Sequence, residues 1–183
     1  MAEEWAIAET PKEPEPDFYC PTSDVFTARL ERLARELDAD PVRRKSAPLV
    51  SSSVGEIGNN SFDHNLGNWP DVRGVFFAYD TGKHSIVLAD RGVGVRATLR
   101  RIRPDLETDE DALKAAFTEF ITGRAPEHRG NGLKFVKDAL MECKASLRFQ
   151  SGHAILGIRK GHPKLMIKRA GAFIRGSLCF INY

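Results

Sequence analysis

Two different periods of apolar and polar positions run along this chain. Apolar side chains recur every three or four positions from Thr22 or Ser23, either of which can cap a first helical turn, to about Asp38. Residues 72–79 and 85–89 are strand-like runs separated by a short turn sequence containing Asp and Gly. The pattern predicts a helix, followed later by a β-hairpin.

Further elements follow the same two periods. Helices are predicted from the serines at 51–53 to about Asn65, from Thr108 or Asp109 to near Gly123, and from the glycine motif at 130–132 to about Cys143. A polar, arginine-rich stretch at 96–103 separates the hairpin from the second of these helices. Four short runs near the end alternate as strands do: 146–150, 154–159, 165–168 and 177–181.

This order of elements indicates an α+β two-layer sandwich, with helices on one face of a mixed, mostly antiparallel sheet. Residues 1–45 are interpreted as an N-terminal extension made of a proline-rich tail, one helix and a basic linker. Residues 46–183 are interpreted as one domain. A length of 183 residues is enough for a self-sufficient core.

Composition narrows the class of protein. Apolar residues make up 42% and charged residues 28%, which is typical of a globular domain. The near-balance of 27 Lys and Arg with 25 Asp and Glu weighs against a strongly basic nucleic-acid binder. The N-terminus is acidic and no long apolar run follows, which favours a cytoplasmic protein without a membrane segment. The three cysteines lack metal-ligand spacing, which favours reduced thiols.

A first polar motif lies within the helix predicted to end at Asn65. Glu56, Asn60 and His64 are four residues apart and therefore share one helix face. A carboxylate and an amide on one stripe can hold a water and a hard cation such as Mg²⁺, which prefers oxygen ligands. The alternative is an ordinary polar helix face.

A second motif follows the apolar strand that ends the predicted hairpin. Asp90 stands at the strand end, and Gly92 and Gly94 follow it. Such glycines let the backbone approach a flat ligand closely while the carboxylate accepts a hydrogen bond. The alternative is a strand that ends in a permissive turn.

A third motif leads directly into the helix predicted to end near Cys143. Glycines at a helix entry free backbone N–H groups to face phosphate oxygens. The sequence is neither a Walker A loop nor GxGxxG, so it does not point to a P-loop or Rossmann fold. An ordinary glycine-rich loop is the alternative. The motif consists of Arg129, Gly130, Asn131, Gly132 and Leu133.

In this order and spacing, the three motifs resemble the nucleotide-binding boxes of the GHKL superfamily, which includes gyrase-type topoisomerases, histidine kinases and MutL repair proteins. The resemblance covers about residues 50–182. Gly176-Ser177 resembles the Gly-Thr that begins the last strand of the family, with Ser in place of Thr. The resemblance implies the Bergerat-type ATP-binding fold, with ATP and Mg²⁺ as cofactors.

The resemblance also implies a role for each matched residue. Glu56 corresponds to the base that orients the attacking water, and Asn60 to the Mg²⁺ ligand. Asp90 corresponds to the acceptor of the adenine amine, and Ser177 is expected to assist it through a water. His64 matches a histidine of kinase-type members, although a structural helix-end histidine is an equal interpretation. Two glycines, Gly92 and Gly94, would let the backbone run beside the adenine ring. Two others, Gly130 and Gly132, would present backbone N–H groups to the phosphates.

Members of the family carry a mobile lid between the second and third boxes, and residues 95–129 occupy that place. This stretch is rich in arginine. Arg124 and Arg129 lie near enough to the third box to reach phosphates bidentately. A solvated loop surface is the alternative interpretation.

Departures from the larger family members restrict the function. The predicted helix upstream of the motifs contains no His, so the chain is not expected to be a self-contained histidine kinase. The chain resembles most closely the small free-standing anti-sigma-factor serine kinases, which use ATP with a partner protein and are often dimers. The leading hypothesis is therefore a Mg·ATP-dependent regulatory ATPase or phosphotransferase. A nucleotide-gated binding module without catalysis and a nucleic-acid-associated ATPase are the alternatives.

Overall fold

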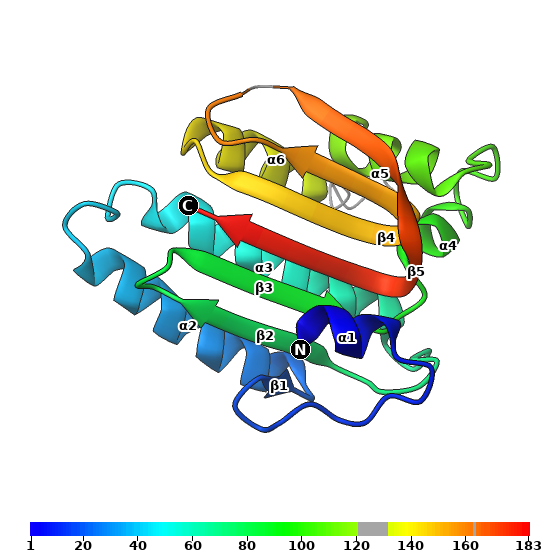
Figure 1. Cartoon of the computed structure of the whole chain (residues 1–183), viewed down its shortest axis with the longest axis horizontal. Helices are drawn as coiled ribbons and strands as arrows, with labels where there is room; N and C mark the ends of the chain where they lie inside the picture. Colours follow the sequence, from blue (N-terminus) through cyan, green and yellow to red (C-terminus); the bar gives the residue numbers. More distant parts are fainter. Residues whose placement is uncertain (121–131, 163) are drawn as a thin grey trace.

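A computed structural model describes residues 1–120, 132–162 and 164–183 of the chain. The helices and strands in these parts follow one another from the N-terminal helix to the last strand (Figure 1). In order, they are α1 (Ala2–Ile7), β1 (Tyr19–Cys20), α2 (Ser23–Ala39), α3 (Ala47–Asn65), β2 (Val75–Asp80), β3 (Ser85–Asp90), α4 (Val95–Leu99), α5 (Asp109–Thr118), α6 (Gly132–Glu142), β4 (Ser146–Ile158) and β5 (Leu165–Asn182).

The strands form one five-stranded sheet in the order β1-β2-β3-β5-β4. Every pair of neighbouring strands in the described chain is antiparallel. The α+β class is therefore confirmed, whereas the expected mixed sheet is not observed. Strand β5 lies between β3 and β4, so it is paired along both of its edges.

The four short strands expected after residue 145 are two long ones. The pairing of β4 with β5 shifts register between Gln150 and Gly152 and again between Gly152 and Ala154. A bulge of this kind interrupts the alternation of apolar and polar residues without ending the strand. The sequence pattern therefore shows breaks where the backbone continues.

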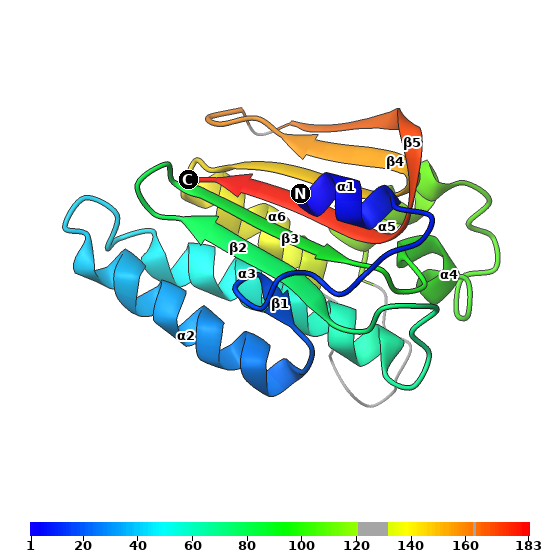
Figure 2. The same cartoon turned by 60° about the horizontal axis from the view of Figure 1, so that its bottom comes forward.

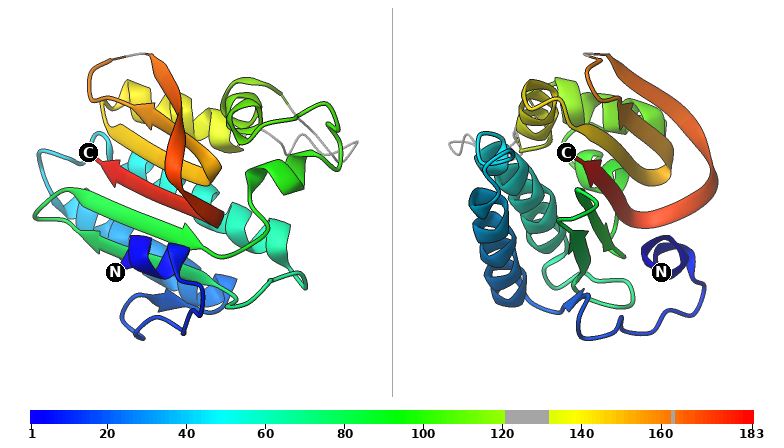
Figure 3. Two further views of the ribbon diagram at one scale, coloured as in Figure 1. Left: turned by 45° about the vertical axis from the view of Figure 1, so that its right-hand side comes forward. Right: turned by 60° about the vertical axis from the view of Figure 1, so that its left-hand side comes forward.

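Helices lie on both faces of the sheet, not on one face as predicted (Figures 2 and 3). The main core lies between the sheet and α2, α3, α5 and α6. A smaller cluster on the opposite face joins Trp5 and Ala6 of α1 to Phe76, Ala89 and Leu178. Neighbouring residues of β2 divide between the two clusters, because side chains alternate across a strand. A second buried face of the sheet explains the continuous apolar run of β2.

Most helix bounds agree with the sequence. Helix α2 has the predicted bounds to within one residue, and the Thr22 side chain accepts a hydrogen bond from Val25 N. Helix α3 begins at Ala47, earlier than predicted, because the serines expected to cap it bond to carbonyls within the helix, as in Ser53 Oγ to Leu49 O. Helix α5 ends at Thr118, and the Phe120 side chain beyond it is 72% exposed.

Residues 1–45 pack against the rest of the chain. Tyr19 pairs with Phe76 of β2 in the sheet, and Phe26, Leu33 and Leu37 of α2 belong to the main core. The domain boundary predicted at residue 45 stays a prediction, and the packing crosses it. In the described residues, no helix combines the length and the apolar character that crossing a membrane requires.

The packing of α3 on α2 depends on Gly58. A methyl group added to Gly58 would lie 2.0 Å from Phe26 Cζ, and the Phe26 ring is fully buried between the rings of Phe62 and Phe77. We expect Gly58→Ala to lower the free energy of unfolding by about 1–3 kcal/mol despite the better helix propensity of Ala. Urea denaturation measures the change. Gly171→Ala is the control, since nothing lies within 4 Å of that position. Equal stability of the two variants would contradict the packing argument.

Candidate functional site

Helix α3 carries two polar stripes of different burial. The residues of the first motif, Glu56, Asn60 and His64, lie on the exposed side, although Asn60 is half-buried. The neighbouring stripe contains Ser61 and Asn65, which are buried. Ser61 bonds to Asp90 at the end of β3, and Asn65 bonds to Val93 in the loop that follows, so α3 connects the first and second motifs.

Asp90 ends β3 and is only 4% exposed. Its Oδ2 accepts hydrogen bonds from Ser61 Oγ at 2.9 Å and from Ser177 Oγ. Its Oδ1 accepts one from Gly92 N at 2.8 Å. A carboxylate has about four acceptor positions. These three hydrogen bonds use most of them, and the backbone N–H of Ser177 also acts on the carboxyl.

Burial raises the pKa of the Asp90 carboxyl above its ordinary value. The hydrogen bonds from Ser177, Gly92 and Ser61 favour the charged form and offset this effect only in part. A buried carboxyl with a raised pKa is often found at functional sites, although structural carboxylates also show one.

Ser177 contacts Asp90 directly, although the sequence-based expectation was a contact through a water. The reason is register, because Asp90 and Ser177 are paired residues of the neighbouring strands β3 and β5. A methyl group at Gly176 would lie 2.3 Å from the backbone oxygen of Asp90. The Gly-Ser pair therefore allows the closest approach of β5 to this carboxylate.

The loop after β3 is held against α3 by Asn65. Its Oδ1 accepts from Val93 N at 2.8 Å, and its Nδ2 donates to Ser61 O at 2.8 Å. A side chain at Gly92 would collide with that amide, since a methyl group there would lie 2.0 Å from Asn65 Nδ2. Gly94 adopts a φ of 82°, which favours glycine.

The first turn of α6 lies against the exposed stripe of α3. A methyl group added to Gly132 would lie 2.4 Å from Glu56 Oε2 and 3.4 Å from Asn60 Nδ2. Leu133, the next residue, packs against the main core. The structure thus brings the described end of the third motif beside the first motif. The remaining candidates of that region lie outside the described residues: Arg124, Arg129, Gly130 and Asn131.

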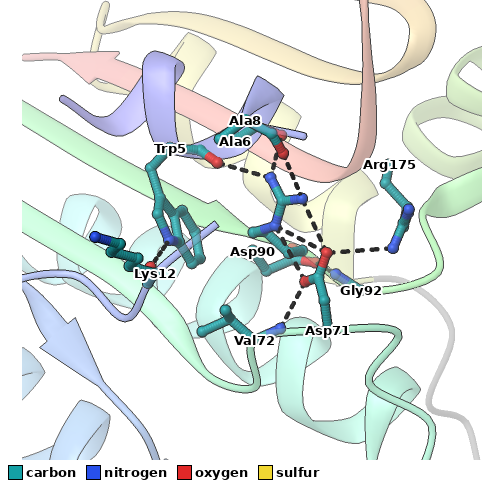
Figure 4. A network of polar contacts seen from close by, with 10 residues as sticks. Trp5, Ala6, Ala8, Lys12, Asp71, Val72, Asp90, Gly92 and Arg175 are labelled. Carbon is teal, nitrogen blue, oxygen red and sulfur yellow. Dashed lines mark hydrogen bonds and ion pairs between the residues drawn. The ribbon is translucent and has the colours of Figure 1, made fainter. Parts of the chain in front are cut away.

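Arg91, between Asp90 and Gly92, anchors the N-terminal helix on the outer face of the sheet. Figure 4 shows its partners Trp5, Ala6, Ala8 and Asp71 close together. Its side chain is 5% exposed. The guanidinium donates to the backbone oxygens of Trp5, Ala6 and Ala8 at 2.7–2.9 Å. It also pairs with Asp71, whose Oδ2 lies 2.9 Å from Nη2. The site loop and α1 are therefore joined by one buried cation.

Asp71 is the anion of this network and also accepts from Arg175 at 3.2 Å. Burial acts to raise the pKa of Asp71, but the hydrogen bonds from Arg91 and Val72 N and the two arginine charges lower it overall. Asp71 is therefore held ionised beside Arg91.

The described part of the predicted lid is more ordered than its polar sequence indicates. It contains α4 and α5, which share a small apolar cluster of Leu106, Ala112 and Ala115 with Val95 and Leu99. Arg103 pairs with Asp105 and Glu119, each at 2.7 Å. No helix was predicted in the polar, arginine-rich stretch at 96–103, and the apolar residues Val95 and Leu99 explain why a short helix forms there.

Several residues of the site were not assigned from the sequence. Ser61 and Asn65 are four residues apart, the same spacing as the exposed stripe, and this signal could have identified them. Arg91 and its partner Asp71 carried no such signal, because their contacts depend on a helix that the sequence pattern did not predict.

No protein-family model matches this chain, and comparison with curated proteins finds no similar sequence. Among the described residues, no three or more His, Cys, Asp or Glu side chains form a group that could hold a metal ion.

Proposed function

We propose that this protein binds Mg·ATP through a GHKL-type, Bergerat-like site and uses it in regulation, by hydrolysis or by phosphate transfer to a partner protein. The observation that carries the proposal is Asp90. It is a buried carboxylate that lies where β3, β5 and α3 meet. The first motif lies on α3, whose Ser61 bonds to Asp90, and the described end of the third motif lies beside Glu56 and Asn60.

The residues present fit an adenine nucleotide. Asp90 is a carboxylate acceptor of the kind that an adenine amine requires, and Gly92, whose missing side chain leaves room for Asn65, lets the loop lie close to α3. The glycine at 132 leaves the backbone of α6 close to Glu56 and Asn60. When bound, Mg²⁺ would neutralise phosphate charge, with Asn60 as its protein ligand and water or phosphate oxygens as the others.

Asp90 and Glu56 would have different roles, one in binding the base and the other in catalysis. Asp90 would select the base, because a carboxylate accepts from the adenine amine but not from the guanine carbonyl. Glu56 is exposed on α3 beside the start of α6, so its carboxylate is free to orient or deprotonate a nucleophile. His64 lies one turn further along the same face and is assigned no step.

The experiment that tests the proposal is calorimetric titration of the protein with ATP and with GTP in Mg²⁺. We expect ATP to bind at least tenfold more tightly than GTP, the equivalent of about 1.4 kcal/mol. Equal affinity for the two nucleotides, or no binding of either, would overturn the assignment of Asp90 as the base-selecting residue.

The role of Asn60 is tested by its dependence on magnesium. We expect Asn60→Ala to weaken ATP binding roughly tenfold, about 1.4 kcal/mol, in Mg²⁺ and much less in EDTA, because the amide acts through the cation. Asn59→Ala is the matched control, since Asn59 is an exposed amide on the same helix but faces a different direction. Equal losses with and without Mg²⁺ would show that Asn60 is not the ligand.

A further inference from the structure

The net charge of the chain is the sum of two unlike parts. All 25 Asp and Glu residues lie within residues 1–142, together with 19 Lys and Arg residues. Residues 143–183 contain eight Lys and Arg and no acidic residue. The near-neutral net charge of the whole chain weighed against a polyanion partner. That net charge includes a strongly basic segment, residues 143–183. Charge asymmetry of this kind points to an anionic partner.

This segment forms β4, the edge strand of the sheet, and β5 beside it (Figures 1 and 2). Two of its cations are paired with acids elsewhere, Arg148 with Glu3 and Arg175 with Asp71. The other six are exposed, and the structure gives them no ion pair with any described carboxylate. These six are Lys144, Arg159, Lys160, Lys164, Lys168 and Arg169.

Alternation along the strands directs one face of the β4–β5 hairpin outward. Leu156 and Ile167 are paired and pack on the main core. The flanking pairs, Ile155 with Lys168 and Gly157 with Met166, therefore point to the opposite face. That face carries cationic and apolar side chains with no acid among them.

A hollow of about 230 Å³ lies at the base of this hairpin. Three arginines and one acid line it: Arg96, Arg100, Arg175 and Asp109, whose carboxylate lies 3.8 Å from Arg96. Phe173 also lines it, with a ring that is 53% exposed and lies 5.2 Å from the ring of His153. Guanidinium planes and an exposed aromatic ring are surfaces on which a nucleic-acid base can stack.

We infer that the β4–β5 edge binds single-stranded nucleic acid, with phosphates along the cationic hairpin and a base against Phe173. The cations alone would fit any polyanion. The exposed ring among arginines favours a strand with unpaired bases over an acidic peptide, which has no flat group to stack, and over a duplex, whose bases are already stacked. The cationic hairpin is separate from Asp90, although the hollow at its base is also lined by Val93 and Gly94 of the second motif. The inference itself does not rest on the proposed nucleotide site.

The test is fluorescence anisotropy of a labelled single-stranded DNA of about 20 nucleotides, titrated with the full chain between about 50 and 200 mM salt. We expect affinity to fall with salt, and the double variant Lys164→Ala/Lys168→Ala to reduce the slope of log K against log[salt] by about 1.4, since each phosphate contact on a single strand contributes about 0.7. Lys83→Ala, at the distant β2–β3 turn, is the control and should leave the slope unchanged.

Phe173→Ala separates stacking from charge. We expect it to weaken binding about tenfold at every salt concentration without changing the slope, because the ring carries no charge. All substituted side chains are exposed, and circular dichroism checks that the variants fold. The Asp90→Asn variant should bind DNA as wild type does, so loss of ATP binding and loss of DNA binding are distinguishable.

Three outcomes would overturn the inference. One is no binding at the lowest salt. Another is displacement of the DNA by polyglutamate at equal charge concentration, which would assign the surface to an acidic protein. The third is tighter binding to the duplex of the same sequence than to the single strand.

Discussion

Replacing Glu56 by alanine is expected to reduce ATP turnover, or phosphate transfer to a partner, by roughly 10²–10⁴-fold, the usual contribution of a positioned general base. The carboxylate lies on the exposed stripe of α3, beside the first turn of α6. Because it is exposed, its removal leaves no buried group unpaired and the fold should survive. ATP affinity should stay within a few-fold, and loss of a negative charge beside phosphates acts to tighten it.

Single-turnover assays with γ-labelled ATP measure this effect, with free phosphate and labelled protein quantified separately. Glu142→Ala, which removes an exposed carboxylate from the last residue of α6, is the control for charge. Wild-type turnover in Glu56→Ala would assign the nucleophile to another group. Binding without turnover in the wild type, with every partner tested, would favour the nucleotide-gated binding module.

Asp90→Asn is expected to weaken ATP binding by roughly one to two decades, since a charge-assisted hydrogen bond in a buried site is worth about 1.5–3 kcal/mol. The free protein, by contrast, should unfold no more easily than wild type at neutral pH. The amide oxygen can accept from Gly92 N, and Ser61 Oγ already lies 3.4 Å from Ile57 O, so its hydroxyl has another acceptor.

The direction in which stability changes with pH follows from the pKa of Asp90. The folded pKa of Asp90 is raised, so the folded state binds more protons than the unfolded state and stability falls as pH rises from the ordinary carboxyl pKa through the raised value. Asp90→Asn removes that slope. Asp80→Asn is expected to remove a slope of the opposite sign. A hydrogen bond from Lys83 N lowers the pKa of Asp80, so the stability that this carboxylate contributes is lost as pH falls.

Urea denaturation at several pH values, together with calorimetric titration, measures both effects of Asp90→Asn. A variant that is clearly less stable than wild type at neutral pH but binds ATP normally would make Asp90 a structural residue that joins β3, β5 and α3.

The sequence pattern was sufficient where local spacing determines the structure. The bounds of α2, the hairpin of β2 and β3, and the start of α6 follow from apolar period and turn residues. The motif residues on α3 and at the end of β3 were identified for the same reason, since each motif is contiguous in the sequence.

What the pattern missed depends on contacts between distant segments. Helix α1 has six residues, too few for a clear period, and it is held by Arg91 from a loop more than eighty positions away. The continuity of β4 and β5 depends on bulges whose register only the paired strands define. Ser61 lies between Asn60 and His64 of the first motif, but its role depends on the position of Asp90.

The place of β5 inside the sheet affects how the protein can fold during synthesis. Among the described strands, β4 pairs only with β5, and β3 needs β5 along one edge, so residues 177–182 complete two pairings at once. The hydrogen bond between Asp90 and Ser177 joins residues 87 positions apart, so it cannot form before β5 has been synthesised. While the ribosome is still making β5, β3 and β4 expose unpaired edges and an open core, the condition in which nascent chains aggregate or engage chaperones. Folding of this chain is therefore expected to be late and cooperative, not progressive from its N-terminus.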